Sequence, residues 1–411
     1  MNKKIVIGVR EAVFFILLTL LYFQNWLIEV NPIFGFLDEG VSLFCLIYFL
    51  YSTINKGKIK KYIFSIFLIA FLIIVIMICF NFFFKIQTNF IPIVEDLFSL
   101  FKFLFVYLGM SEYLTRNRIN RTTVAKAFTP LLKFYLLVLF ICSIFNLFID
   151  INMDSGSRYG FRMFSFIYDT PGHIINQASY SLLILNAVGD SMKRNKIWIG
   201  ITLFIMTMTL KTRAFILIVS YFSFIYVFKL KRKRNMVLES GIIASLIILV
   251  GYSQFDHYFL NNGTPRQMFV AGALKLVREY FPFGTGFATY GSSAASDDYS
   301  KLYYQLGFST RWGLDPTTKL FLNDNYLPMV FVQFGLILGC IYILLIYKII
   351  KGFLNSIKNQ QSPTLKVVTY FFLSDIVLSS IQSSYLAHYS VVTLSIFYFI
   401  FFYNDVLEEL G

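Results

Sequence analysis

Long apolar segments recur along almost the whole of this 411-residue chain, and they limit its possible folds more than any other feature. A helix that crosses the hydrocarbon core of a bilayer needs about 20 predominantly apolar residues. Only 14% of the residues are charged, whereas a soluble domain of this size carries roughly 25%. No polar stretch is long enough for a separate soluble domain. We therefore predict one integral membrane domain over residues 1–411, all-α and multi-pass.

The segment 197–229 decides how many spans are expected. As one helix it would be about 50 Å long and would place Lys211 and Arg213 near the bilayer centre. Two short spans with "KTR" at the turn bring both charges to water, so we predict a break there. The twelve expected spans are 11–28, 33–52, 62–84, 92–113, 131–150, 172–189, 197–210, 213–229, 236–253, 325–347, 366–382 and 388–404.

The distribution of basic residues along the chain predicts its orientation in the membrane. With the N-terminus inside, "NKGKIKK", "TRNRINRTTVAK", "SMKRNK", "KLKRKRN" and the connection from Lys348 to Lys366 all lie on the cytoplasmic side. That distribution follows the positive-inside rule, so we expect a protein of the cytoplasmic membrane with both termini inside. The net charge of +14 is then mostly an inner collar against anionic lipid head groups. It does not indicate a nucleic-acid partner.

One predicted connection is out of scale with the others. About 70 residues, 254–324, separate the ninth and tenth spans on the outer face, and loops of that length usually have a function. Within this loop Thr264 can cap a helix whose first turn contains Pro265. One face of that helix would be apolar, formed by Met268, Phe269, Leu276 and Tyr280. We expect such a helix to lie on the membrane surface.

The stretch "PFGTGFATYG", residues 282–291, follows this helix and resembles a phosphate-binding loop at first sight. No strand precedes it, it lacks the lysine of a GxxxxGK[ST] loop, and it is expected on the outer face, so a nucleotide loop is excluded. Two alternatives stay open for Gly284 and Gly286. They form a tight anion-binding turn, or they shape a turn that returns the surface helix to the bundle.

Arginines gather on the predicted outer face, although the topology rule does not require them there. The guanidinium group binds phosphate bidentately and stays protonated. Any single one could instead contact a lipid head group at the interface, but as a set they favour a site for a polyanion. The predicted diphosphate-binding residues are Arg158, Arg162, Arg213, Arg266 and Arg278.

Several other ionisable residues are candidates for a functional site. Asp297, Asp298 and Asp324 lie in or at the end of the large loop, and any of them could act as a base. Lys102 and Asp375 are expected in mid-span, where each must pair or face a polar cavity. The four cysteines all fall inside predicted spans and show no spacing typical of a metal site or a disulfide framework. We therefore expect no metal and no cofactor.

Three segments resemble those of a known family. They are "SRYGFRMFSFIYDTPGH", "LKTRAFILIVSYF" and "PRQMFVAGALKLVREYFPFGTGFATYG…DNYLPMVFVQFGLILG". Their order is similar to that of the O-antigen ligase and Wzy-type polysaccharide polymerase superfamily, whose members have about twelve spans and a large outer loop late in the chain. The similarity covers about residues 158–340. Where that family often has His-Asn before the late span, this chain has Asp324-Asn325.

The resemblance implies an enzyme that transfers a glycan from a polyprenyl-diphosphate carrier at the outer membrane face without nucleotide or metal. The expected partners are the lipid-linked donor and acceptor, membrane lipids and other polysaccharide-assembly proteins. Polymerisation of repeat units is the leading expectation, with Asp324, Asp297 or Asp298 as base. A ligase of the same superfamily is the second. A lipid-linked oligosaccharide flippase or other transporter is the third, and it should place charges near the midplane in paired halves.

Overall fold

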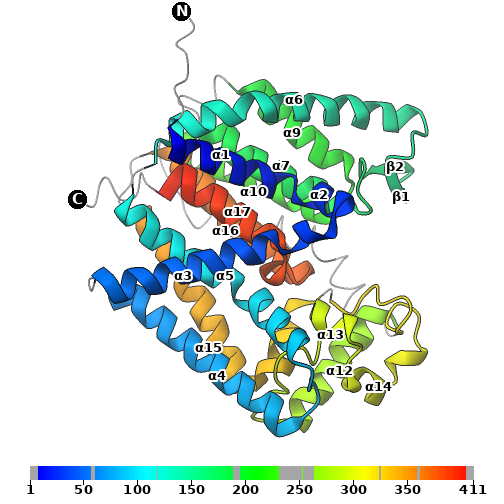
Figure 1. Ribbon diagram of the computed structural model, residues 1–411. Coiled ribbons are helices and arrows are strands. Elements are labelled where there is room, and N and C mark those ends of the chain that lie inside the picture. The colour runs from blue at the N-terminus through cyan, green and yellow to red at the C-terminus, as the bar shows by residue number, and fades with distance from the viewer. Residues whose placement is uncertain are drawn as a thin grey trace, which may run out of the picture.

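The computed structural model describes residues 8–56, 61–117, 119–187, 195–230, 252, 263–323, 325–358 and 362–403. Over these ranges the chain is almost entirely helical, with one two-stranded sheet (Figure 1). Six of the described helices are long and apolar enough to cross a membrane, or seven if a bent pair counts as one span. The chain is therefore an all-α membrane protein, and its twelve spans stay a prediction.

The N-terminal part is built from helices alone. The first two are bent by 70° at Phe23 and together match the first predicted span. The elements are α1 (Val9–Tyr22), α2 (Gln24–Val30), the 3-10 turn η1 (Pro32–Phe36), α3 (Leu37–Lys56), α4 (Lys61–Phe84), α5 (Phe90–Arg116) and α6 (Arg121–Phe148).

A β-hairpin follows, and then three shorter helical segments. The hairpin was not predicted. The elements are β1 (Asp154–Arg158), β2 (Phe161–Phe164), α7 (Pro171–Ala187), α9 (Lys196–Met208), α10 (Thr212–Ile225) and the π-helical turn η2 (Tyr226–Leu230). The ninth predicted span, 236–253, and the start of the large loop, 254–262, lie outside the continuously described chain.

The C-terminal part contains the described portion of the large loop and the last helices. The elements are α12 (Pro265–Glu279), α13 (Ser293–Asp297), α14 (Lys301–Gln305), the 3-10 turn η4 (Phe308–Thr310), α15 (Tyr326–Ser356), α16 (Pro363–Gln382), the 3-10 turn η5 (Tyr385–Ala387), α17 (Tyr389–Tyr398) and the π-helical turn η6 (Phe399–Tyr403). The predicted break between the seventh and eighth spans is confirmed, because α9 ends at Met208 and α10 begins at Thr212.

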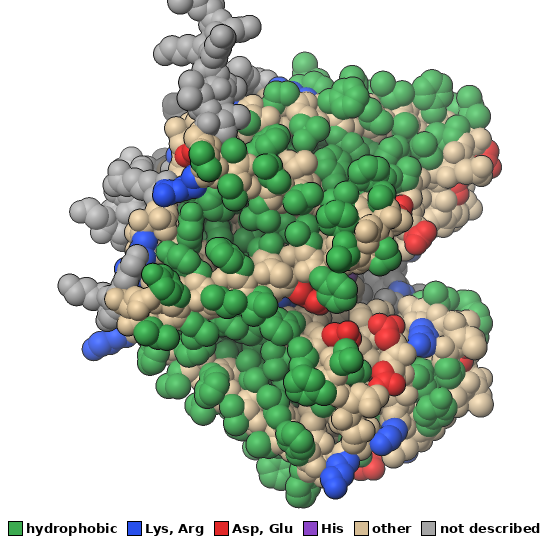
Figure 2. All heavy atoms as spheres, viewed as in Figure 1, with side chains coloured by type: hydrophobic (Ala, Val, Ile, Leu, Met, Phe, Trp, Pro, Cys, Tyr) green, Lys and Arg blue, Asp and Glu red, His purple; other side chains and the backbone are tan. Residues whose placement is uncertain are grey.

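The helices pack in two groups that meet where α17 contacts α5 and where α16 contacts α15. Helices α1, α6, α7, α9, α10, α16 and α17 lie together, and α3, α4 and α15 lie beside α5 (Figure 1). The β-hairpin and the α12–α14 segment both project from the same end of the bundle, with a hollow between them (Figure 2). Hydrophobic side chains dominate the surface of the helices in that view. On α4, for example, Phe71 and Leu72 are both exposed. Apolar patches of this extent are typical of a surface that faces lipid.

The α12–α14 segment has a small hydrophobic core of its own. Phe269 and Leu276 of α12 are buried in it, and the ring of Phe269 stacks on Tyr290 at a centroid distance of 4.5 Å. The predicted helix and its Thr264 cap are confirmed, since the Thr264 side chain accepts from the backbone N–H of Gln267. The expectation that the apolar face would contact the membrane is wrong for Phe269 and Leu276. Aromatic residues later in the loop cover that face instead.

Candidate functional site

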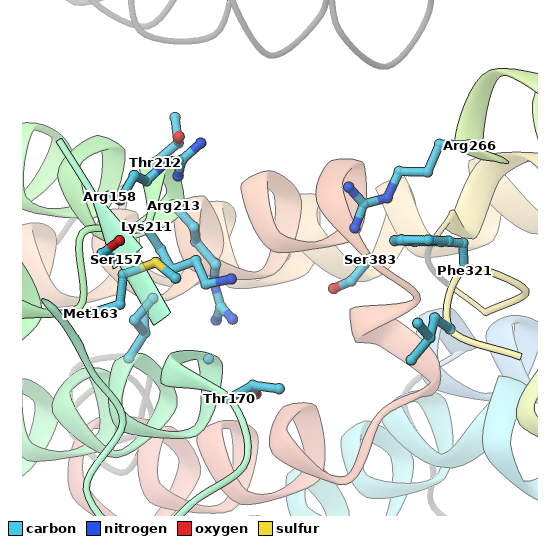
Figure 3. A pocket seen from close by; sticks show the side chains of 13 residues that line it. Ser157, Arg158, Met163, Thr170, Lys211, Thr212, Arg213, Arg266, Phe321 and Ser383 are labelled. Atoms are coloured by element: carbon cyan, nitrogen blue, oxygen red, sulfur yellow. The ribbon is translucent and has the colours of Figure 1, made fainter. Parts of the chain in front are cut away.

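A cavity of about 600 Å³ opens at the end of the bundle between the β-hairpin and α12 (Figure 3). The hairpin, the start of α7 and the α9–α10 turn line one side, and the start of α12 lines the other. We call this cavity the cationic pocket. Its lining residues are Ser157, Arg158, Met163, Thr170, Gly172, Ile175, Lys211, Thr212, Arg213, Arg266, Leu320, Phe321 and Ser383.

The hairpin places Arg158 in the cationic pocket. Arg158 is the last residue of β1 and pairs with Phe161 across a two-residue turn. Both turn residues, Tyr159 and Gly160, have positive φ, which is the geometry that suits a tight hairpin. The Nη1 group of Arg158 donates to the carbonyl oxygen of Leu210 at 3.3 Å, in the α9–α10 turn. This contact ties the hairpin to the turn, so Arg158 lies on the same side of the pocket as Lys211.

Arg213 stands in the first turn of α10 and is held by α16 and by the turn that follows α16. Its Nη2 lies 2.9 Å from Oδ1 of Asp375 in α16, and its guanidinium carbon lies 4.7 Å from the ring centroid of Tyr385. The Ser379 hydroxyl donates to the same Asp375 oxygen at 2.7 Å. Asp375 therefore pairs with Arg213. Lys102, the other charge expected in mid-span, pairs with Asp38 of α3 at 2.7 Å.

Arg266 enters the pocket from the opposite side. It follows Pro265 in the first turn of α12, and its guanidinium lies over the ring of Phe321 at 5.0 Å from the centroid. In Figure 3 its side chain extends toward the space that Arg158 and Arg213 border from the other side. The first turn of a helix also presents backbone N–H groups and the positive end of the dipole, which favour an anion.

The described lining of the pocket is rich in basic residues. It contains four cations, Arg158, Lys211, Arg213 and Arg266, and no carboxylate among the described lining residues. Asp375, which pairs with Arg213, is not one of the lining residues. Serine and threonine hydroxyls also line the pocket, beside apolar side chains. Such an arrangement can bind a multiply charged anion through charge-assisted hydrogen bonds.

Two of the five predicted arginines do not line the pocket. Arg162, in β2, has its Nη2 3.7 Å from Oδ2 of Asp150. Arg278 is exposed in the last turn of α12, twelve residues after Arg266. At about 1.5 Å rise per residue the two positions are roughly 18 Å apart along the helix, which is too far to share one phosphate group.

Two of the candidate bases are not among the residues that line the pocket, and the third is outside the described residues. Asp298 accepts hydrogen bonds from Gln87 Nε2 at 3.0 Å and Asn89 Nδ2 at 2.8 Å, so it links α13 to the α4–α5 connection. Asp297 is exposed at the end of α13. Neither lines the cationic pocket. Asp324 lies outside the described residues, and its catalytic role stays a prediction.

The Gly-rich stretch 282–291 packs into α15 rather than along the pocket. The backbone N–H groups of Thr285 and Gly286 donate to the carbonyl oxygens of Val332 and Gln333, each at 3.0 Å. At the next turn Gly335 leaves helical geometry, with φ 76° and ψ 178°. A side chain on Gly284 would come within 1.9 Å of the Gln333 carbonyl oxygen. Because the N–H groups of Thr285 and Gly286 are used within the protein, the geometry favours a packing turn over an anion-binding turn.

An apolar groove of about 330 Å³ adjoins the cationic pocket. Its lining comes from α12, the first turns of α15 and the end of α16, and includes Val270, Leu274, Phe331 and Ile381. Val270 lies one helical turn after Arg266, and Ile381 lies two residues before Ser383. The two cavities therefore share the start of α12 and the end of α16. Together they offer a charged site beside an apolar one.

Some features of the pocket had no clear sequence signal. Lys211 was expected only as a turn residue that reaches water, and Phe321 and Ser383 were not singled out at all. The "SGSRYG" sequence of the hairpin, with glycines two residues before and after Arg158, was the one available signal for a tight turn.

No protein-family model matches this sequence, and no curated protein matches it. The resemblance to the O-antigen ligase and Wzy-type polymerase superfamily therefore depends on the three short segments alone.

Proposed function

We propose that this protein is a membrane glycosyltransferase that polymerises polyprenyl-diphosphate-linked repeat units into a surface polysaccharide. The observation that carries the proposal is the convergence of Arg158, Arg213 and Arg266 on one pocket from three separate parts of the chain. The sequence predicts these three arginines, together with Arg162 and Arg278, as diphosphate ligands. A separate structural role for each arginine would not explain why all three side chains line the same pocket.

The chemistry of the proposed reaction suits this pocket. The leaving group is a lipid diphosphate, on which negative charge increases as the glycosidic bond breaks. Preorganised cations stabilise that developing charge, and they do so most strongly where water is excluded. Arginine also stays protonated at any accessible pH. The adjoining apolar groove along α12 would receive the isoprenoid next to the diphosphate.

The acceptor hydroxyl needs a positioned base. Since Asp297 and Asp298 do not line the pocket, we propose Asp324 as the base. The next residue, Asn325, occupies the N-cap position of α15 without a side-chain capping hydrogen bond and lines the apolar groove. The reaction would take place at the outer face of the cytoplasmic membrane, with both termini inside and with other polysaccharide-assembly proteins as partners.

A second function, transport of a lipid-linked oligosaccharide, is favoured by a different observation. Two ion pairs, Lys102–Asp38 and Arg213–Asp375, are buried within the helix bundle. Ionisable residues inside a membrane domain commonly mark a substrate path. Of these four residues, Arg213 lines the cationic pocket.

The test is incubation of the purified protein with a lipid-diphosphate-linked repeat unit, followed by separation of the products by size. A ladder of products supports polymerisation, and a single transfer to a different acceptor indicates a ligase. The alternative outcome is that the protein binds the substrate without turnover and, when reconstituted in vesicles, moves it from one leaflet to the other. That result indicates transport and overturns the proposal.

The same assay checks the pocket residues. We expect Arg158→Ala, Arg213→Ala and Arg266→Ala to lose almost all activity, and the matching lysine variants to retain part of it because lysine keeps the charge without the bidentate fork. Lys275→Ala is the matched control, since Lys275 is an exposed cation on the same helix as Arg266 and does not line the pocket. Normal ladders from all three alanine variants would show that the arginines only contact lipid head groups.

A further inference from the structure

Asp375 is fully buried in α16 and does not line the cationic pocket, yet it contacts one of the pocket's cations. Its carboxylate lies between Arg213 of α10 and Ser379, one turn further along α16. The aromatic ring of Tyr385, in the turn after α16, covers the guanidinium of Arg213. The side chain of Arg213 is thus held by groups that belong to α16 and to the turn that follows it.

The contact between the two charges is made through a single oxygen. Oδ1 of Asp375 receives both the Arg213 Nη2 group and the Ser379 hydroxyl, at 2.9 and 2.7 Å. Oδ2 of Asp375 and Nε of Arg213 are buried and have no hydrogen-bond partner among the described residues. Arginine–carboxylate pairs are frequently bidentate. In this pair only one carboxylate oxygen contacts the guanidinium.

The orientation of the Arg213 guanidinium matters for ligand binding because of rotamer entropy. An arginine side chain has large rotamer freedom, and a guanidinium that must reach a ligand loses that freedom on binding unless the protein has already fixed it. The Ser379 hydroxyl fixes the orientation of the carboxylate, and the carboxylate in turn fixes the Nη2 edge of Arg213. The Tyr385 ring limits movement out of that plane.

We propose that Asp375 is a positioning residue that sets the orientation of the Arg213 guanidinium at the cationic pocket, so that anion binding depends on a carboxylate outside the pocket. The inference rests on the proposed function only in taking the pocket as the diphosphate site. It assigns to Asp375 a role in ligand affinity in addition to its role as a buried counter-ion.

The test measures the affinity of the purified, detergent-solubilised protein for inorganic pyrophosphate, together with its thermal unfolding midpoint. We expect Asp375→Asn to weaken pyrophosphate binding by about tenfold in the folded protein, because the loss of a fixed Arg213 guanidinium, on the scale of one charge-assisted hydrogen bond, outweighs the removal of one negative charge beside the pocket. Ser379→Ala keeps both charges and should weaken binding by a smaller factor with little change in the midpoint. Asp375→Glu keeps the charge and should recover part of the affinity.

Asp38→Asn is the matched control. It breaks the other buried pair, Lys102–Asp38, which does not line the pocket. It should lower the unfolding midpoint but leave the pyrophosphate affinity of the folded protein within about twofold, because Asp38 and Lys102 pair with each other and neither lines the pocket.

Wild-type affinity in folded Asp375→Asn and in Ser379→Ala would overturn the positioning role. If Asp375→Asn does not fold, Ser379→Ala decides the question alone. Because pyrophosphate binding is measured without turnover, a protein that binds but makes no polymer refutes the proposed reaction and leaves this inference standing. Wild-type affinity in Arg213→Ala would refute both, since the pocket would not be the anion site.

Discussion

Gly284 offers the sharpest test of how the large loop is attached to the bundle. A Cβ atom at this position would lie 1.9 Å from the carbonyl oxygen of Gln333 and 2.3 Å from the carbonyl carbon of Phe334. Both are backbone atoms, so no side-chain rotation can relieve the overlap. In Gly284→Ala the loop must move away from α15, and the hydrogen bonds that Thr285 and Gly286 donate to α15 are lost.

The cost follows from those two bonds. Leaving a buried hydrogen-bonding group unsatisfied costs about 1–3 kcal/mol, so the loss of two bonds should remove roughly 2–6 kcal/mol of unfolding free energy. We expect the thermal unfolding midpoint in detergent to fall by about 4–12 °C, on a scale of about 2 °C per kcal/mol for a chain of this size. Gly200→Ala is the control. A Cβ there meets nothing within 4 Å, and alanine in a helix is favoured over glycine by up to about 1 kcal/mol.

Two results would refute this reasoning. A wild-type midpoint for Gly284→Ala would mean that the loop and α15 are not in close contact. An unchanged midpoint combined with lost pyrophosphate binding would mean that residues 282–291 bind the anion and do not serve as a packing turn.

Three further predictions concern other elements. Thr264→Ala should cost about 1 kcal/mol by removing the α12 cap, which thermal unfolding would detect, whereas Thr264→Ser should be nearly neutral. Lys102→Met should lower the free energy of unfolding by about 3–5 kcal/mol because it leaves Asp38 buried without its counter-ion. The double variant with Asp38→Leu should recover most of that loss, and failure to recover it would mean that the pair has another role. A cysteine at the exposed position of Ser293, introduced as Ser293→Cys, should react with an impermeant thiol reagent added to intact cells, and labelling only after lysis would reverse the proposed orientation.

Local signals predicted the elements that local chemistry determines. Thr264 followed by Pro265 marked the start of α12, and that helix begins at Pro265. The charges at Lys211 and Arg213 marked a break in an apolar run, and the helices end and begin around it. In each case a short-range rule was enough, either a cap at a helix end or the cost of charge within lipid.

Long-range partners could not be predicted in the same way. Hydropathy places Lys102 and Asp375 at a depth in the membrane but says nothing about the rotation of their helices, so it could not show that each pairs with a different residue. The apolar face of α12 had a similar ambiguity. Phe269 and Leu276 need an apolar neighbour, and the pattern alone does not distinguish lipid from the aromatic residues that follow in the loop.

The interruption of α15 at Gly335 also bears on how the chain is made. Ribosomes synthesise a chain from its N-terminus, so Asn81 of α4, which pairs with Phe287, and the 282–291 stretch are complete before α15 emerges. Thr285 and Gly286, which donate to the carbonyl groups of Val332 and Gln333, are therefore already present when α15 is made. A permuted chain in which α15 came first would lack those donors when α15 is made. In the natural order the donors to α15 therefore always precede their acceptors.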